Sequence, residues 1–128
     1  MFTDEEINAK QLSPLNLAFI GDGIYEILVR EMLVGEANRP VNDLHAQSIK
    51  FVSATAQCEA YDKIKNDLTE EEEAVFRRGR NAKVSHSPKS ASQGQYHIAT
   101  GIEALFGYLY LCDRKERIRE LFKIILDK

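Results

Sequence analysis

Apolar residues recur with a helical period between residues 13 and 33 of the chain. They are Leu17, Ile20, Ile24, Ile27 and Leu28. This spacing predicts a helix from Ser13 to about Leu33 that is packed over most of its surface. Ser13 followed by Pro14 favours a start at this point, because serine caps helices and proline suits the first helical position. Gly35 and Pro40 predict its end.

Similar patterns predict helices in the rest of the chain, and no stretch alternates convincingly enough to be a strand. Two capping boxes, Thr3 to Glu6 and Thr69 to Glu72, each mark a helix start. Asp113 with Glu116 is expected to cap the last helix. The expected helices span residues 3–12, 13–33, 41–65, 69–83, 96–111 and 113–126. The chain is therefore predicted to be all-α, with about six helices.

The composition is that of an ordinary globular protein, with 44% hydrophobic and 29% charged residues among 128. This length predicts a single domain over residues 1–128. The sequence shows no N-terminal leader and no apolar run long enough to cross a membrane. Cys58 and Cys112 favour reduced thiols in the cytoplasm over a disulfide framework. The net charge of -3 gives no sign of nucleic acid, but the charges are unevenly distributed.

Two carboxylates stand out because they lie in apolar helices. Asp22 lies between Gly21 and Gly23, and such small neighbours let another segment approach the backbone closely. Glu103 lies in the predicted helix 96–111, which is apolar almost all round and belongs in the middle of the domain. A buried carboxylate needs a partner or a metal. The two residues therefore predict a shared site for Mg²⁺ or Mn²⁺, which prefer oxygen ligands.

Simpler interpretations stay open for both carboxylates. Asp22 can be a surface-facing aspartate on a boundary helix, since charges are seldom fully buried. Glu103 can pair with an arginine or a hydroxyl as a structural ion pair. Glu26 lies one turn after Asp22 on the same helix face, so it is a further candidate for metal binding on spacing alone.

Basic residues gather at the end of the predicted helix 69–83 and in the segment that follows. They are Arg77, Arg78, Arg80, Lys83 and Lys89. Residues 84–95 are rich in serine and lack an apolar period, so they are expected to form an exposed, mobile loop. Basic side chains beside such a loop suit the phosphate backbone of a nucleic acid. The alternative is a solvated charged face that follows the helix dipole.

At these residues the sequence resembles a known family. Residues 17–26, Leu-Ala-Phe-Ile-Gly-Asp-Gly-Ile-Tyr-Glu, resemble the signature helix of the ribonuclease III catalytic domain. Residues 102–111 resemble the second metal-binding helix of that family. Residues 44–45, 52–54 and 70–83 are similar to its short branch, Mini-ribonuclease III, which lacks the double-stranded-RNA-binding domain. The resemblance covers roughly residues 13–126.

Two departures from ribonuclease III at large concern the metal site. The family usually has a glutamate four residues before the signature aspartate, where this chain has Ala18. It also has an aspartate three residues before the second-helix glutamate, where this chain has Thr100. Both substitutions look like the Mini branch. Asp22 and Glu103 match the family's motifs, so the resemblance implies that these two are the metal ligands and catalytic residues. Further ligands are left open.

The resemblance implies a magnesium-dependent endoribonuclease that cleaves double-stranded RNA and leaves 5′-phosphate and 3′-hydroxyl ends. The metal, held by Asp22 and Glu103, is expected to orient and deprotonate the attacking water. The basic residues are expected to grip the duplex by its backbone and shape. Likeness to the Mini branch further implies maturation of 23S ribosomal RNA precursor ends in the cytoplasm, a homodimer, and a large-subunit ribosomal protein as partner.

Phe19 is expected at the interface of that homodimer. It lies three residues before Asp22, where the ribonuclease III family places an apolar residue that fills a pocket of the other subunit. The alternative is a phenylalanine in the core of its own subunit, because the helix is apolar on most sides.

Two other classes of protein stay open. One is a non-catalytic protein that binds duplex RNA or a pre-ribosome through a degraded metal site, an interpretation motivated by Ala18 and Thr100. The other is an all-α magnesium pyrophosphohydrolase of nucleotides, which needs Glu-x-x-Glu pairs facing a cleft. Residues 70–73 are the only such run, and they belong to a polar first turn. Duplex RNA cleavage with and without Mg²⁺ separates the nuclease from both.

Overall fold

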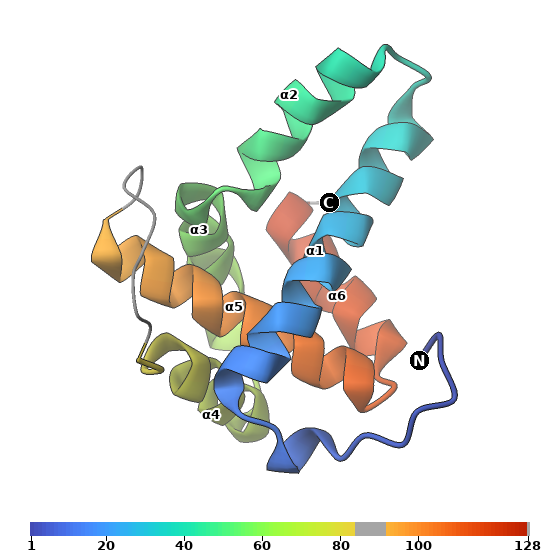
Figure 1. Cartoon of the computed structure of the whole chain (residues 1–128). Coiled ribbons are helices and arrows are strands. Elements are labelled where there is room, and N and C mark those ends of the chain that lie inside the picture. The colour runs from blue at the N-terminus through green and yellow to red at the C-terminus, as the bar shows by residue number, and fades with distance from the viewer. Residues whose placement is uncertain (84–91, 128) are drawn as a thin grey trace.

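The computed structural model describes residues 1–83 and 92–127, and Figure 1 shows their arrangement. Six α-helices and two short 3-10 turns make up this described part, which contains no strand. The elements are η1 (Ala9–Gln11), α1 (Pro14–Glu36), α2 (Val41–Val52), α3 (Ala54–Ile64), η2 (Lys65–Asp67), α4 (Glu70–Arg80), α5 (Gln93–Leu111) and α6 (Lys115–Leu126). The prediction of an all-α fold with about six helices is therefore confirmed. Over the same residues, no helix combines the length and apolarity that a membrane crossing needs.

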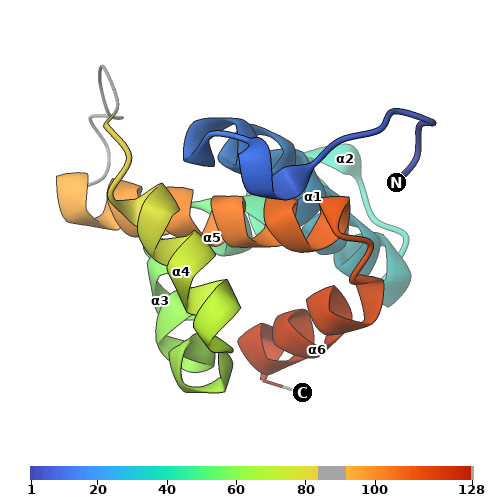
Figure 2. The ribbon, with the colours of Figure 1, turned by 90° about the horizontal axis from the view of Figure 1, so that it is seen from below.

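Helix α5 lies in the centre of the fold. Figure 2 shows α1 on one side of it, with α3, α4 and α6 on the other, and all four helices contact it. Every α5 residue from Ala99 to Tyr110 is buried except Glu103, which is half-buried. The apolar sequence explains this position, because a helix that is apolar on all sides must be covered on all sides.

Glycines let α1 and α5 approach each other closely at Glu103. A Cβ atom on Gly21 would overlap the backbone carbonyl of Glu103, and one on Gly107 would overlap the carbonyl of Leu17. Only glycine allows such contact between helix backbones. The expectation that another segment approaches the backbone beside Asp22 is therefore confirmed, and that segment is the turn of α5 that carries Glu103.

The single helix predicted over residues 41–65 is wrong, because the structure breaks it at Ser53. The Ser53 backbone is extended (φ -62°, ψ 157°), and its hydroxyl accepts a hydrogen bond from the Ala56 amide at 3.2 Å. Serine here caps a new helix instead of continuing the old one. The break lets α2 pack on α1 while α3 packs on α5.

The predicted first helix over residues 3–12 is also wrong, since only η1 forms there. The Asn8 side chain caps this turn by accepting from the Lys10 amide at 3.1 Å. The residues before it are held by tertiary contacts: the Phe2 amide donates to the Tyr110 hydroxyl at 2.8 Å, and the two rings lie 5.5 Å apart. A short isolated helix is only marginally stable in water, so contacts with the end of α5 decide the conformation.

Other helix ends differ from the predicted ones by about a turn. α1 continues beyond its predicted end, and α4 stops at Arg80. α5 begins at Gln93, where Ser92 caps it, so the predicted loop 84–95 is shorter at its far end. The rest of that predicted loop, residues 84–91, lies outside the described residues.

Asp113 does not cap α6 as predicted. Its backbone has a left-handed conformation (φ 58°), which places it in the turn that leaves α5. The N-cap of α6 is Arg114, and this residue makes no side-chain capping bond. Helix α6 is stabilised by its apolar face and by contacts with α4 instead.

Two glutamates in the first turn of α4 form ion pairs with arginines of α6 and of the turn before it. Glu72, only 2% exposed, receives hydrogen bonds from Nε and Nη2 of Arg117, both at 2.8 Å. Glu71 receives hydrogen bonds from Arg114 at 2.8 and 3.2 Å and from the Tyr108 hydroxyl at 2.5 Å. These acids have cationic partners, and they hold α4 and α6 together beneath α5.

Candidate active site

Asp22 of α1 and Glu103 of α5 lie side by side because their helices cross at Gly21. Their carboxyl groups are close enough to share a hydrogen bond. Burial, followed by the negative charge of Asp22 and by this hydrogen bond, raises the pKa of Glu103 from 4.5 to about 8. Glu103 therefore retains a proton at neutral pH in the metal-free chain. A bound cation reverses this preference, because it favours the charged form of both groups.

Neither carboxylate has a basic partner among the residues that the structure describes. The ion pairs in this part of the chain all involve other acidic groups. The alternative of a structural ion pair at Glu103 is therefore not found there. Asp22 is exposed, as the surface-facing alternative held, but it lies against a second carboxyl group. This leaves a pair of adjacent carboxyl groups that is open to solvent and not compensated by a cation.

An oxygen-only pair fits a hard divalent cation. Mg²⁺ keeps several waters and commonly takes only one or two protein carboxylates. Glu26, the spacing-based candidate, accepts from Nε of Arg30 at 3.2 Å, although its charge still raises the pKa of Glu103. Within residues 1–83 and 92–127, no three His, Cys, Asp or Glu side chains gather as a metal-binding group. The available donor set is therefore the pair Asp22 and Glu103.

The two positions that depart from ribonuclease III are used for packing. Ala18 belongs to a small apolar cluster that includes Val75 and Tyr108. Thr100 donates its hydroxyl hydrogen to the Tyr96 carbonyl at 2.9 Å, one turn earlier in α5. Both residues are buried, so neither offers an oxygen in place of the family's further carboxylates.

Gln57 of α3 is a neighbour of Glu103 that sequence reasoning missed. Its side chain forms a hydrogen bond with Glu103 that lowers the pKa of that carboxyl group, against the larger effects that raise it. A signal was available in the sequence: Gln57 shares one helix face with Ala60 and Ile64, and all three are buried. A polar residue on the apolar face of a helix marks a contact with another polar group.

The basic residues of the predicted RNA-binding cluster lie at the end of α4. This helix crosses α5 beside the turn of Glu103: a Cβ atom on Gly79 would lie 2.7 Å from the Cβ atom of Ala104. The cluster therefore borders the level of α5 at which α1 also crosses. Lys89, the fifth predicted member, lies outside the described residues.

Two of the four placed basic residues also have contacts within the fold. Arg78 donates to a backbone carbonyl just before α1 at 3.3 Å, and the Arg80 guanidinium lies 5.8 Å from the centre of the Phe76 ring. Arg77 and Lys83 are exposed. These two are the members of the cluster best placed to meet an external phosphate.

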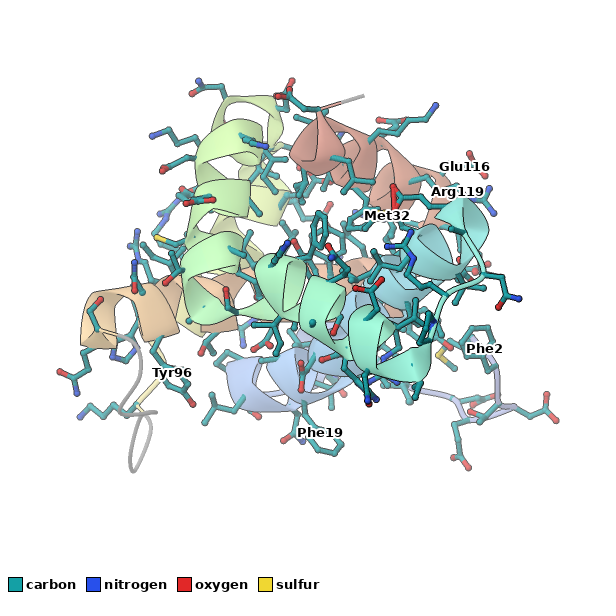
Figure 3. The ribbon with its side chains drawn as sticks, turned by 90° about the horizontal axis from the view of Figure 1, so that it is seen from above. Phe2, Phe19, Met32, Tyr96, Glu116 and Arg119 are labelled. Carbon is teal, nitrogen blue, oxygen red and sulfur yellow. The ribbon has the colours of Figure 1, made fainter. Side chains whose placement is uncertain are left out.

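Phe19 lies on the surface of the described chain. It is 85% exposed, and Figure 3 shows its ring pointing away from α1 and from the rest of the molecule. Leu15, one turn earlier in α1, is exposed as well. The alternative of a core phenylalanine is therefore wrong, and an exposed apolar side chain stands one turn from Asp22.

Known proteins share both this fold and this sequence. A family profile described as "Ribonuclease III domain" matches residues 15–114. Mini-ribonuclease 3 of Thermoanaerobacter sp. is 46% identical over 88% of this chain and 80% of its own length. Mini-ribonuclease 3 of Symbiobacterium thermophilum is 46% identical over 94% of this chain and 92% of its own. A crystal structure of a Fusobacterium nucleatum protein superposes with a TM-score of 0.84 at 31% identity, covering 95% of this chain and 98% of that one.

The fold, the family profile and these relatives define the class of the chain as an endoribonuclease of the ribonuclease III type. Relatives at this identity, covered along most of their length, narrow the assignment. Within the class, the chain belongs to the Mini-ribonuclease 3 family.

Proposed function

We propose that this chain is a magnesium-dependent endoribonuclease that cleaves double-stranded RNA, with residues 1–128 forming one catalytic domain. The observation that carries the proposal is the adjacent pair Asp22 and Glu103, which has no basic partner among the described residues. Both residues are proposed to be catalytic, as ligands of Mg²⁺, with Mn²⁺ as a substitute. When bound, the metal supplies an activated water and offsets negative charge on the phosphodiester.

Asp22 and Glu103 have different parts in this proposal. Asp22 is exposed, so its carboxylate faces the solvent from which RNA approaches. Glu103 is half-buried and releases its proton when the site takes up a cation, because the cation stabilises the charged form. The products that family resemblance favours carry 5′-phosphate and 3′-hydroxyl ends.

The end of α4 is proposed to bind the RNA backbone. Duplex RNA is recognised mainly by its shape and phosphates, because its deep, narrow major groove is hard for side chains to read. The proposed contacts come from Arg77, Arg78, Arg80, Lys83 and Lys89. The exposure of Arg77 and Lys83 supports this assignment most directly.

The proposed working form is a homodimer with Phe19 at its interface. Duplex RNA has two antiparallel strands related by approximate two-fold symmetry, so one site per chain cuts both strands in one encounter only in a two-fold dimer. Phe19 and Asp22 are about 60° apart around the helix at 3.6 residues per turn. One can therefore face a partner subunit while the other faces RNA.

The natural substrate is proposed to be the precursor of 23S ribosomal RNA, processed in the cytoplasm with a large-subunit ribosomal protein as partner. These three points rest on resemblance to the Mini branch. The absence of carboxylates at Ala18 and Thr100 favours a second candidate, a non-catalytic duplex-RNA-binding protein. Labelled duplex RNA, incubated with and without Mg²⁺, decides between them: products only with Mg²⁺ support the nuclease, and binding without cleavage supports the second candidate.

A further inference from the structure

Gln57 is buried in an unusual way for a polar side chain. It is 2% exposed, and its Nε2 donates to the Val52 carbonyl at 3.1 Å. Its Oε1 is the buried side-chain oxygen for which the described residues provide no hydrogen-bond partner. Leaving such an atom unsatisfied costs about 1–3 kcal/mol, so the position calls for an explanation.

The Gln57 side chain lies against the proposed active site. Helix α3 packs on α5, and Gln57 shares a hydrogen bond with the Glu103 carboxylate. An amide nitrogen has two N–H groups, so Nε2 can serve the Val52 carbonyl and Glu103 together. Oε1 belongs to the same planar group, so it also lies close to the Glu103 carboxylate.

We propose that Gln57 is a positioning residue, which anchors the Glu103 carboxylate to the junction of α2 and α3 and so presets the metal site. The inference rests on the proposed function, since it assumes that Glu103 binds a divalent cation. In it, Nε2 holds the carboxylate in place, and Oε1 accepts a hydrogen bond from a water of the hydrated cation. This second contact accounts for an oxygen that is otherwise unsatisfied.

A purely structural role predicts something different. In that case Gln57 only ties α3 to the last carbonyl of α2, and its removal lowers thermal stability without changing the affinity for metal. Gln57→Met separates the two roles, because methionine has a similar length and no hydrogen-bonding amide. Removing an unsatisfied buried oxygen together with its group is nearly neutral for stability.

The first measurement is Mn²⁺ binding to the full chain without RNA, by titration calorimetry. Gln57→Met is expected to weaken binding about 10-fold or more, the usual effect of losing a residue that orients a metal ligand. Its melting midpoint is expected to stay within about 4 °C of wild type. Ser48→Ala is the matched control: Ser48 is also buried and donates to the His45 carbonyl at 2.8 Å, without a carboxylate partner. It is expected to bind Mn²⁺ like wild type.

A second measurement is RNA cleavage over a range of Mg²⁺ concentrations. For Gln57→Met the half-saturating Mg²⁺ concentration should rise about 10-fold, while the rate at saturating Mg²⁺ recovers most of the wild-type value. Gln57→Asn keeps the amide but is one methylene shorter, so it should show the same shift. Wild-type Mn²⁺ affinity in both variants overturns the inference.

The outcomes distinguish this inference from the proposed function. If wild type binds Mn²⁺ and Asp22→Asn does not, the metal site stands, and the Gln57 variants then decide the inference alone. If wild type itself fails to bind millimolar Mn²⁺, both ideas are overturned. Should Gln57→Met unfold, the wild-type side-chain amide signal of Gln57 in NMR decides: a shift on adding Mg²⁺ supports the anchor, and no shift refutes it.

Discussion

The fold contains two pairs of carboxylates whose electrostatic situations are opposite. In the pair on α4, hydrogen bonds from Arg114 and then Tyr108 lower the pKa of Glu71 to about 2. Burial acts to raise the pKa of Glu72, but hydrogen bonds from Arg117 and from the backbone outweigh it and hold that pKa below its usual range. In the pair formed by α1 and α5, burial and mutual repulsion raise the pKa of Glu103 to about 8.

The difference teaches which acidic residues of this chain serve stability and which serve chemistry. Glu71 and Glu72 have their counter-charges within the fold, so their charges are satisfied before any ligand arrives. Asp22 and Glu103 have none among the described residues, so they are held together only by the helix crossing. Such an arrangement destabilises the empty protein slightly and gains from a cation supplied from outside.

The largest expected effect comes from removing charge at the uncompensated pair. Asp22→Asn keeps the size of the side chain and removes a proposed ligand, so cleavage in Mg²⁺ should fall at least ~1000-fold, or roughly 4 kcal/mol in activation free energy. Duplex binding should persist, because the surface becomes less negative. Single-turnover cleavage and a binding titration measure the two effects. Glu31→Gln, an exposed change on the same helix, is the control, and wild-type cleavage by Asp22→Asn contradicts the assignment.

Breaking the compensated pair should affect stability and leave chemistry intact. Arg117→Ala leaves the Glu72 carboxylate buried without its partner, which should lower the free energy of unfolding by roughly 3 kcal/mol. Urea unfolding measures the loss, and cleavage per folded molecule should stay unchanged at low temperature. Arg119→Ala is the control, because its pair with Glu116 is exposed and surface pairs contribute little. Equal losses in both variants would contradict the distinction.

A carboxylate can also be introduced on the surface proposed to meet a second subunit. Phe19→Asp should weaken the dimer at least ~30-fold, because the charge loses its hydration in the interface. The monomer should stay helical, since the side chain is 85% exposed. Sedimentation and circular dichroism test both statements, with Phe19→Leu as the conservative control. A variant that remains dimeric, or that loses its helices together with its dimer, places Phe19 outside a dimer interface.

The two pairs should respond to pH in opposite directions. For Glu103 the folded pKa of about 8 lies above the ordinary 4.5, so its contribution to stability is present below pH 4.5 and is lost as the pH rises through about 8. For Glu71 the folded pKa of about 2 lies below 4.5, so its contribution is lost as the pH falls toward 2.

Thermal melts of the metal-free protein between about pH 6 and pH 9 measure the first of these trends. The midpoint should decline with rising pH in wild type and decline less in Glu103→Gln. Mg²⁺ should raise the wild-type midpoint more at the upper end of the range. A decline that is equally steep in Glu103→Gln assigns the effect to another group.

The smallest effect concerns cations that the fold leaves exposed. Replacing Arg77 and Lys83 together by alanine should weaken RNA binding and flatten its salt dependence by about 0.7 to 0.9 in log K per lost phosphate contact. Lys115 and Lys123, exposed on α6, provide a double-alanine control of equal charge. An unchanged slope in the first variant reduces the basic cluster to a solvated face.

The sequence by itself determined the helical fold and drew attention to both proposed ligands. The periodic apolar residues and the Ser13 cap specify α1, and an unbroken apolar stretch specifies α5 as the central helix. Asp22 and Glu103 were visible as charges in the wrong company, because local composition makes a lone carboxylate costly. Such signals are readable in one dimension, since they depend on residues within a few turns of each other.

Only the tertiary structure decided which groups meet. Two capping signals gave different results: at Ser53 a cap broke a predicted helix, while at Thr3 a capping box formed no helix because Phe2 binds Tyr110. The approach of Asp22 to Glu103 depends on two helices touching at Gly21, and the exposure of Phe19 depends on what covers α1. Contacts between residues far apart in the chain determine these outcomes, and local propensities of about 1 kcal/mol per residue are too small to overrule them.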